Sequence, residues 1–133
     1  EEGAPYKAKV SGDRRHVKEL ADTPQGQLLA MFDVLEGGFL EDGFKGCMFI
    51  KASAEFQEAG HPINAQALEH KRLIHEYLAD LARQAGHDAP RDLAAELLTL
   101  KEGAIVLAAM SHSSAPADDA KRAAKRLLAV AAG

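Results

Sequence analysis

The chain has 133 residues, of which 47% are hydrophobic and 27% are charged, and its formal net charge is −4. This length suits one domain with its own core, and the acidic balance gives no general attraction to nucleic acid or to anionic membranes. A single cysteine excludes an internal disulfide and suits a reducing compartment, and no apolar run approaches the roughly 18 residues of a membrane span. We therefore expect a cytoplasmic protein that does not bind membranes.

Residues 1–22 contain few apolar side chains, and their five basic residues are balanced by five acidic ones. We expect a poorly ordered lead-in or linker there, with a short helix near Val17–Ala21. The apolar residues of the chain are rich in alanine and leucine, which favours helices over strands. The sequence therefore predicts a lead-in followed by one helical domain over residues 23–133.

The first long helix is predicted to begin at Thr23 and Pro24, because threonine caps a helix well and proline suits its first position. Gly37-Gly38 should loosen its end. Its apolar residues recur at spacings of a helical face, and they are Leu28, Phe32, Leu35 and Phe39. A shorter helix is expected over residues 47–56, after a turn.

Three further helices follow. The first is predicted from about Ile63 to Ala85, with Gly86 as its C-terminal cap. Its apolar stripe consists of Ile63, Ala67, His70, Ile74, Tyr77 and Leu81. The next, from about Asp88 and Pro90 to His112, is apolar nearly all round, and the last covers about Ala117 to Ala132. The chain is therefore predicted to be all-α, with five helices.

The last two helices present more apolar surface than a domain of this size is expected to cover. A second copy could bury the excess in a four-helix bundle with two-fold symmetry. Alternatively, the fourth helix is simply the central core helix of a monomer. The expected dimer interface consists of Leu100, Ala104, Leu107, Ala108, Ala120, Ala124, Leu127 and Leu128.

Several short motifs occur along the chain in order. They are Gly46-Cys47 followed by Glu55, then His61-Pro62, then Glu69–Lys71 with its His70-Lys71 pair, and finally Leu100 followed by Gly103-Ala104. In this order and at this spacing, residues 23–133 resemble the C-terminal domain of TetR-family transcriptional regulators.

This resemblance implies a domain that binds an effector and forms a homodimer. In such regulators an N-terminal helical domain binds operator DNA, the C-terminal domain holds a small hydrophobic or amphipathic molecule, and the last two helices of each subunit form the dimer bundle. A helix-turn-helix domain needs about 45 residues, and residues 1–22 are too short and too charged to supply one. Operator DNA is therefore expected as a partner only through an N-terminal domain outside this chain, which would be a fragment or a stand-alone sensor.

The effector is expected to lie among apolar side chains, with His70 and Tyr77 as polar groups that orient it. The alternative for each residue is ordinary core packing. The candidates are Phe32, Leu35, Phe39, Phe49, Ile50, His70, Ile74, Tyr77, Leu98, Ile105 and Met110.

Cys47 has two interpretations. It follows Gly46 where a helix is expected to begin, and backbone N–H groups and nearby lysines there would favour a reactive thiolate. A redox or electrophile sensor is one reading. Free cysteine is also among the most buried residue types, so packing beneath the turn is the other reading.

Enzymatic and metal-dependent functions have little support. His70 and His75 are five residues apart and so point to different faces of a helix, whereas a helical metal site needs a spacing of four. The sequence has no glycine-rich phosphate loop and no recognisable nucleophile and base. We therefore expect no cofactor, no metal and no catalysis. The leading prediction is a ligand sensor, and the main alternative is a helical homodimeric interaction module without a ligand.

Overall fold

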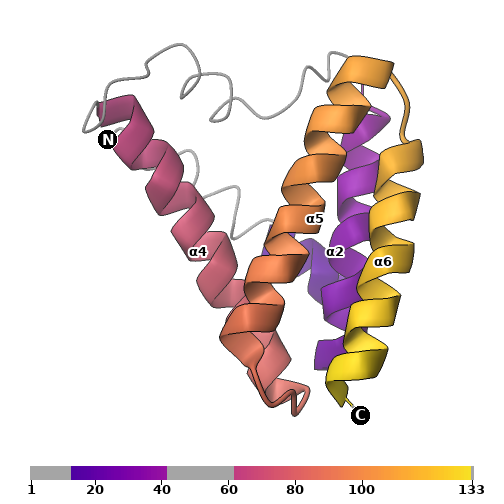
Figure 1. Ribbon diagram of the computed structural model, residues 1–133. Helices are drawn as coiled ribbons and strands as arrows, with labels where there is room; N and C mark the ends of the chain where they lie inside the picture. The colour runs from indigo at the N-terminus through magenta and orange to yellow at the C-terminus, as the bar shows by residue number, and fades with distance from the viewer. Residues whose placement is uncertain (1–12, 42–61, 133) are drawn as a thin grey trace.

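The computed structural model describes residues 13–41 and 62–132, and all of its regular elements in these ranges are helices (Figure 1). A helical stretch over residues 13–20 comes first. It is followed by α2 (Pro24–Phe39), α4 (Pro62–Gln84), α5 (Pro90–Ser111) and α6 (Ala115–Ala132). The predicted all-α class is confirmed. The helix expected over residues 47–56 lies outside the described residues.

The start of α2 follows from its capping residues. The side chain of Thr23 accepts a hydrogen bond from the backbone N–H of Gly26 at 3.0 Å, and Pro24 occupies the first helical position. Both features satisfy or remove backbone donors that would otherwise lack partners. The predicted start of this helix is therefore confirmed.

The turn between α4 and α5 depends on Gly86, as predicted. Gly86 has a φ of 87°, in the left-handed region that glycine adopts without strain. The backbone N–H of His87 donates to the carbonyl of Ala82 at 3.1 Å, and that of Gly86 donates to Arg83 at 3.0 Å. These two bonds form a Schellman motif, which ends α4 and lets α5 return alongside it.

The last helix begins two residues earlier than predicted, at Ala115 rather than Ala117. The hydroxyl of Ser113 accepts a hydrogen bond from the backbone N–H of Ala115 at 3.1 Å. Pro116 is then tolerated in the first turn, where its missing N–H has no helical partner to lose.

The helices form a bundle from which α4 diverges. In Figure 1, α5 and α6 run side by side in opposite directions, α2 lies behind them, and α4 approaches α5 most closely near the turn that joins the two. The largest fully buried side chains include Leu28 and Phe32 of α2, Leu78 of α4, Leu97 of α5 and Leu128 of α6. One contiguous core therefore connects all four labelled helices.

The segment before α2 also contributes to this core. Val17, in the helical stretch over residues 13–20, is only 1% exposed and belongs to the same cluster as Leu28 and Phe32. The short helix expected near Val17–Ala21 is thus present, but it begins earlier. Within the described ranges, no helix has the length and apolar character needed to span a membrane.

Candidate functional site

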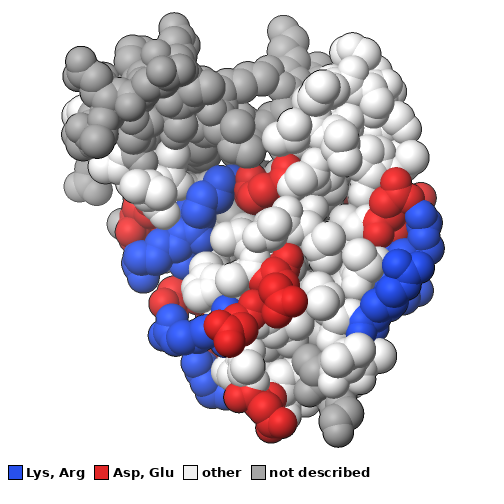
Figure 2. All heavy atoms as spheres, in the orientation of Figure 1, with Lys and Arg blue, Asp and Glu red and all other residues white. Residues whose placement is uncertain are grey.

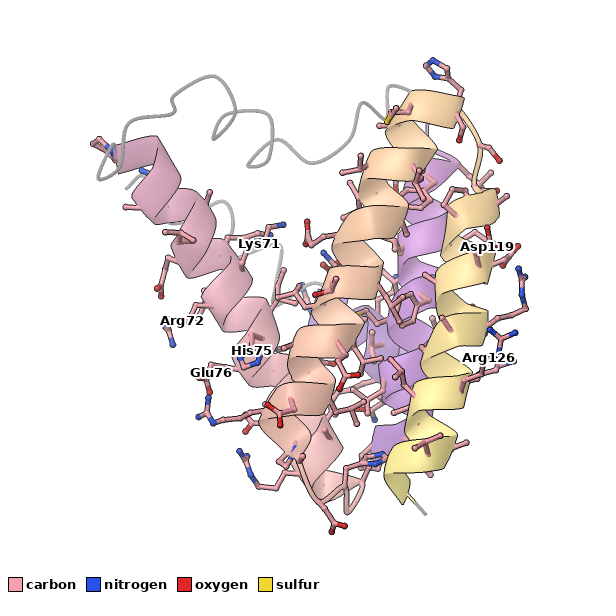
Figure 3. All side chains as sticks on the ribbon, viewed as in Figure 1. Lys71, Arg72, His75, Glu76, Asp119 and Arg126 are labelled. Atoms are coloured by element: carbon pink, nitrogen blue, oxygen red, sulfur yellow. The ribbon has the colours of Figure 1, made fainter. Side chains whose placement is uncertain are left out.

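The inner face of α4 contains the polar residues that were predicted to orient a ligand. His70 is 4% exposed and Ile74 is 8% exposed, while Tyr77 is half-buried and packs against the core. Several charged residues of α4 lie on its other side, among them Arg72, which projects away from α5 in Figure 3. Glu76 lies at the border of the two sides and pairs with Arg91 at the start of α5, with 3.3 Å between Arg91 Nη1 and Glu76 Oε1. Ala67, His70, Ile74 and Leu81 of the predicted apolar stripe are buried, whereas the side chain of Ile63 lies outside the described residues.

Most of the described candidates for ligand contact meet at one core cluster. Phe32 and Ile74 belong to it, and Leu35, Phe39, Tyr77 and Leu98 pack against it. Ile105 is also buried, at 7% exposure. Phe49 and Ile50, and also Cys47, lie outside the described residues. The candidates from α2, α4 and α5 thus belong to or pack against one common core, apart from Ile105, which is buried outside that cluster.

Met110 does not belong with these residues. Its side chain is 74% exposed, on the outer side of α5. The reason is helical periodicity, because Met110 follows Gly103 and Leu107 at spacings of seven and three residues, and both of those positions face outward as well. The prediction that Met110 lines an internal ligand site is therefore wrong for this arrangement of the chain.

Tyr77 has a buried hydroxyl and a stacked cation. Its hydroxyl oxygen is buried and has no hydrogen-bond partner among the described residues. The guanidinium of Arg14 lies over its ring, 4.7 Å from the ring centroid, in the geometry of a cation–π interaction. Burial raises the pKa of Tyr77, and the positive charge of Arg14 only partly opposes this effect. Tyr77 therefore remains a neutral phenol that can both donate and accept one further hydrogen bond.

A charged cluster joins α4 to α5 beside this face. Lys71 Nζ lies 2.8 Å from Glu102 Oε1, and Lys101 Nζ lies 3.4 Å from the same oxygen. Figure 3 shows Lys71 projecting from α4 toward α5. All three side chains are mostly buried, at 13% to 22% exposure. The second oxygen of Glu102 is buried without a hydrogen-bond partner among the described residues.

The pKa of Glu102 reflects two opposing effects. Burial alone would raise the pKa, because it penalises the charged carboxylate. The charge of Lys101 and the hydrogen bond and charge of Lys71 outweigh burial, so the pKa is lowered. Sequence reasoning missed this cluster, because Lys71 and Glu102 are 31 residues apart and nothing local connects them.

Two other histidines have structural partners. His75 Nε2 donates to the backbone carbonyl of Arg91 at 3.0 Å, which ties α4 to the start of α5. His87 is 5% exposed, and its Nε2 lies 2.7 Å from the side-chain oxygen of Gln25 in α2. In residues 13–41 and 62–132, no group of three or more His, Cys, Asp or Glu side chains could hold a metal ion.

The predicted dimer interface requires a correction. Five of its eight residues are at most 6% exposed within one chain, and they are Ala104, Ala108, Ala120, Ala124 and Leu128. These mostly small residues let α5 and α6 pack closely inside the domain, so they leave no surface for a partner. Leu100 and Leu127 are partly buried against the core, and Leu107 alone is well exposed, at 57%.

The fold and the sequence assign this domain to a class of regulator. A family model described as "Tetracyclin repressor-like, C-terminal domain" matches residues 24–124. The chain therefore belongs to the family of TetR-type regulator C-terminal domains.

Known relatives agree with this assignment. The HTH-type transcriptional regulator YjdC of Escherichia coli strain K12 is 26% identical over 115 residues, and the YjdC of Shigella flexneri matches equally well. The match covers 86% of this chain but only 60% of each regulator. The crystal structure of SCO4454, a TetR-family transcriptional regulator from Streptomyces coelicolor, has a TM-score of 0.82 at 21% identity, covering 92% of this chain and 67% of that one. At that identity the structural likeness shows the fold.

Proposed function

We propose that this chain is the effector-sensing and dimerising domain of a TetR-type repressor. A small hydrophobic or amphipathic molecule would bind at the inner face of α4 and control operator binding by an N-terminal domain outside this chain. Family membership supports the regulatory role, and so do the HTH-type regulators of whose length the chain spans 60%. Such a protein would act in the cytoplasm and would perform no catalysis.

The buried hydroxyl of Tyr77 is the observation that best supports a ligand. A buried polar group without a partner is unfavourable, and native proteins contain few of them. A ligand with an apolar body and one hydrogen-bonding group would satisfy this hydroxyl. The apolar residues around the same cluster would contact the rest of the molecule.

Contacts also connect Tyr77 of α4 to the helical stretch over residues 13–20, before α2. Arg14 precedes α2 and lies over the ring of Tyr77, and Val17 anchors the same helical stretch in the core. A ligand that shifts Tyr77 would therefore disturb the position of residues 13–20. The size of the shift in DNA binding is limited by the difference in ligand affinity between the two arrangements.

The proposed dimer would use the outer sides of α5 and α6. Val106, Leu107 and Met110 of α5 and Val130 of α6 are exposed by 41% or more. A two-fold contact would bury the same patch on both subunits. This proposal replaces the buried alanines of the sequence prediction by residues that a partner could reach.

A reporter fluorophore tests the ligand proposal, because the chain contains no tryptophan. Phe39→Trp would place one indole against the core cluster, and Leu68→Trp, at a position that is 72% exposed and outside both proposed surfaces, would serve as the control. Anilinonaphthalenesulfonate, an amphipathic fluorescent probe, is titrated into each variant. We expect saturable energy transfer from the Phe39→Trp reporter at one probe per chain, and weak, unsaturated transfer from the control.

The main alternative is an interaction module without a ligand. It is favoured by Phe32, which is 1% exposed and packed into a contiguous core. No saturable transfer from the Phe39→Trp reporter would support this alternative. A redox role for Cys47 is a further alternative, and thiol labelling of the native chain tests it. Labelling only after denaturation would exclude it.

A further inference from the structure

Glu102 of α5 and its two lysine partners differ from the other described ion pairs in being mostly buried. Figure 2 shows charged side chains at the surface over α4 and along α6, and the members of the other described ion pairs are exposed by 28% to 67%. Glu102 is exposed by 22%, and its partners Lys71 and Lys101 by 20% and 13%. Buried charges lose their hydration, so their polar atoms need hydrogen-bond partners within the protein or from a bound molecule.

The two carboxylate oxygens of Glu102 differ in their contacts. Oε1 accepts hydrogen bonds from Lys71 Nζ at 2.8 Å and from Lys101 Nζ at 3.4 Å. Oε2 is buried and has no hydrogen-bond partner among the described residues. An unsatisfied acceptor is more costly when it carries charge, and native proteins contain few such atoms. A hydrogen-bond donor from a bound molecule would therefore be favourable at Oε2.

Glu102 and Tyr77 lie at neighbouring levels of the contact between α4 and α5. Lys71, which pairs with Glu102, precedes Tyr77 by six residues, a rise of about 9 Å along α4. Helical side chains lean toward the N-terminus of their own helix. Since α4 and α5 run in opposite directions (Figure 1), we expect Tyr77 and Glu102 to lean toward the same stretch between the helices. Ile74 and Leu98, which belong to or pack against the core, supply apolar contacts at this level.

The charges of the cluster indicate which kind of donor suits Oε2. Burial opposes the ionisation of Glu102, but the charges of Lys101 and Lys71 outweigh burial and lower its pKa. The carboxylate is therefore ionised at neutral pH, and Oε2 can accept a hydrogen bond but cannot donate one. Two lysines already contact this carboxylate, so a third cation gains little, and an anionic group placed against Oε2 would be repelled. An uncharged hydroxyl or N–H group meets neither difficulty.

We infer that the effector is an apolar molecule with an uncharged hydroxyl or N–H group that donates a hydrogen bond to Oε2 of Glu102. The inference rests on the proposed function and specifies the ligand class and one residue that selects it. The apolar body would lie along Ile74 and Leu98. It would extend toward Tyr77, whose hydroxyl can form a second hydrogen bond.

Two naphthalene compounds of nearly equal shape test this inference. 2-Naphthol has a hydroxyl where 2-methylnaphthalene has a methyl group, so only 2-naphthol can donate to Oε2. Each compound is used to displace anilinonaphthalenesulfonate, which has an N–H donor of its own, from the Phe39→Trp reporter. We expect 2-naphthol to bind at least about fivefold more tightly, because a site with apolar contacts alone would favour the methyl compound.

Three variants in the reporter background identify the acceptor. Glu102→Gln should reduce the preference for 2-naphthol to less than about twofold, because a neutral amide is a weaker acceptor than a carboxylate. Glu96→Gln, at an exposed glutamate of the same helix, is the matched control and should leave the preference unchanged. Tyr77→Phe should retain most of the preference, since it leaves the carboxylate in place. Thermal unfolding verifies that each variant is folded at the temperature of the titration.

The outcomes separate this inference from the proposed function. If anilinonaphthalenesulfonate gives no saturable transfer from the reporter, the ligand site on α4 is contradicted and this inference with it. If the probe binds but 2-naphthol has no advantage, or neither compound displaces the probe, the ligand class is overturned while the site stands. A preference that persists in Glu102→Gln, or that disappears in Tyr77→Phe, would show that Glu102 is not the acceptor.

Discussion

The inner face of α4 and the outer face of α5 are both apolar stripes. Each contains one residue that does not fit the apolar pattern, and the two residues differ in kind. On α4 the exception is a buried hydroxyl, Tyr77, which lacks a hydrogen-bond partner among the described residues. On α5 it is an exposed glycine, Gly103, which lacks a packing reason within the chain. The first feature is an unsatisfied polar atom among the described residues inside the domain, whereas the second is an open position on its surface. Apolar helix faces of one small domain therefore differ in kind, since one holds a buried polar atom and the other an exposed glycine.

The largest expected effect is on stability, when a core side chain is shortened and compared with an exposed one. Phe32→Ala should lower the free energy of unfolding by about 3–5 kcal/mol, because Phe32 is 1% exposed and its removal leaves a cavity. Met110→Ala, at 74% exposure, should change it by less than about 0.5 kcal/mol in the monomer. Urea unfolding measures both. Similar losses for the two variants would show that the described core does not hold the domain together.

The charged cluster beside α4 should give a pH-dependent effect. Glu102 has a folded-state pKa below its ordinary value of 4.5, so its ionisation stabilises the fold above that pH. This contribution should be lost as the pH falls below 4.5 through the folded pKa. Glu102→Gln should lower stability at neutral pH by about 1–3 kcal/mol, because Lys71 and Lys101 lose their charged partner.

Unfolding of both proteins between neutral and acidic pH tests this expectation. The difference between wild type and Glu102→Gln should shrink as the pH falls. A difference that is constant across this range would mean that the charge of Glu102 does not stabilise the fold.

Tyr77→Phe should have a smaller effect of the opposite sign. It removes a buried hydroxyl without a described partner and keeps the ring beneath Arg14, so the free chain should be unchanged or up to about 1 kcal/mol more stable. Binding of anilinonaphthalenesulfonate to the Phe39→Trp reporter should weaken in the same background if the probe uses this hydroxyl. Thermal unfolding and the fluorescence titration give the two readings, and a clear loss of stability would mean that the hydroxyl is already satisfied.

The smallest expected change in stability comes from the contact between Arg14, before α2, and the ring of Tyr77. Arg14→Gln should lower stability by about 0.5–1 kcal/mol through loss of the contact with the Tyr77 ring. Combining Arg14→Gln with Tyr77→Leu in a double-mutant cycle isolates this contact from the other effects of each change. A coupling energy of zero between Arg14 and Tyr77 would contradict the proposed link between α4 and residues 13–20.

The sequence predicted the local features well. Thr23, Pro24, Gly86 and the stripe of α4 have signals within a few residues of themselves, and the structure confirms each of them. Contacts between distant segments were not predictable in this way. The pairing of Lys71 with Glu102 and the stacking of Arg14 on Tyr77 depend on how separate helices meet.

The dimer residues show why periodicity alone was insufficient on α5. This helix is apolar nearly all round, so its sequence does not reveal which side faces inward. Ala104 and Ala108 are small enough to suit either a partner helix or the neighbouring α6, and the structure places them inside the chain. Only the burial of each residue distinguishes Leu107 from these alanines.

Hydrogen–deuterium exchange with and without saturating anilinonaphthalenesulfonate tests whether a ligand binds at the inner face of α4, because it reports on α4 and α5 in one experiment. A ligand at this site should slow exchange in α4 around Tyr77 and in residues 13–20, and should leave exchange around Val106 and Leu107 on α5 unchanged. Protection confined to the outer side of α5, or absent from the whole chain, would contradict a ligand site on the inner face of α4.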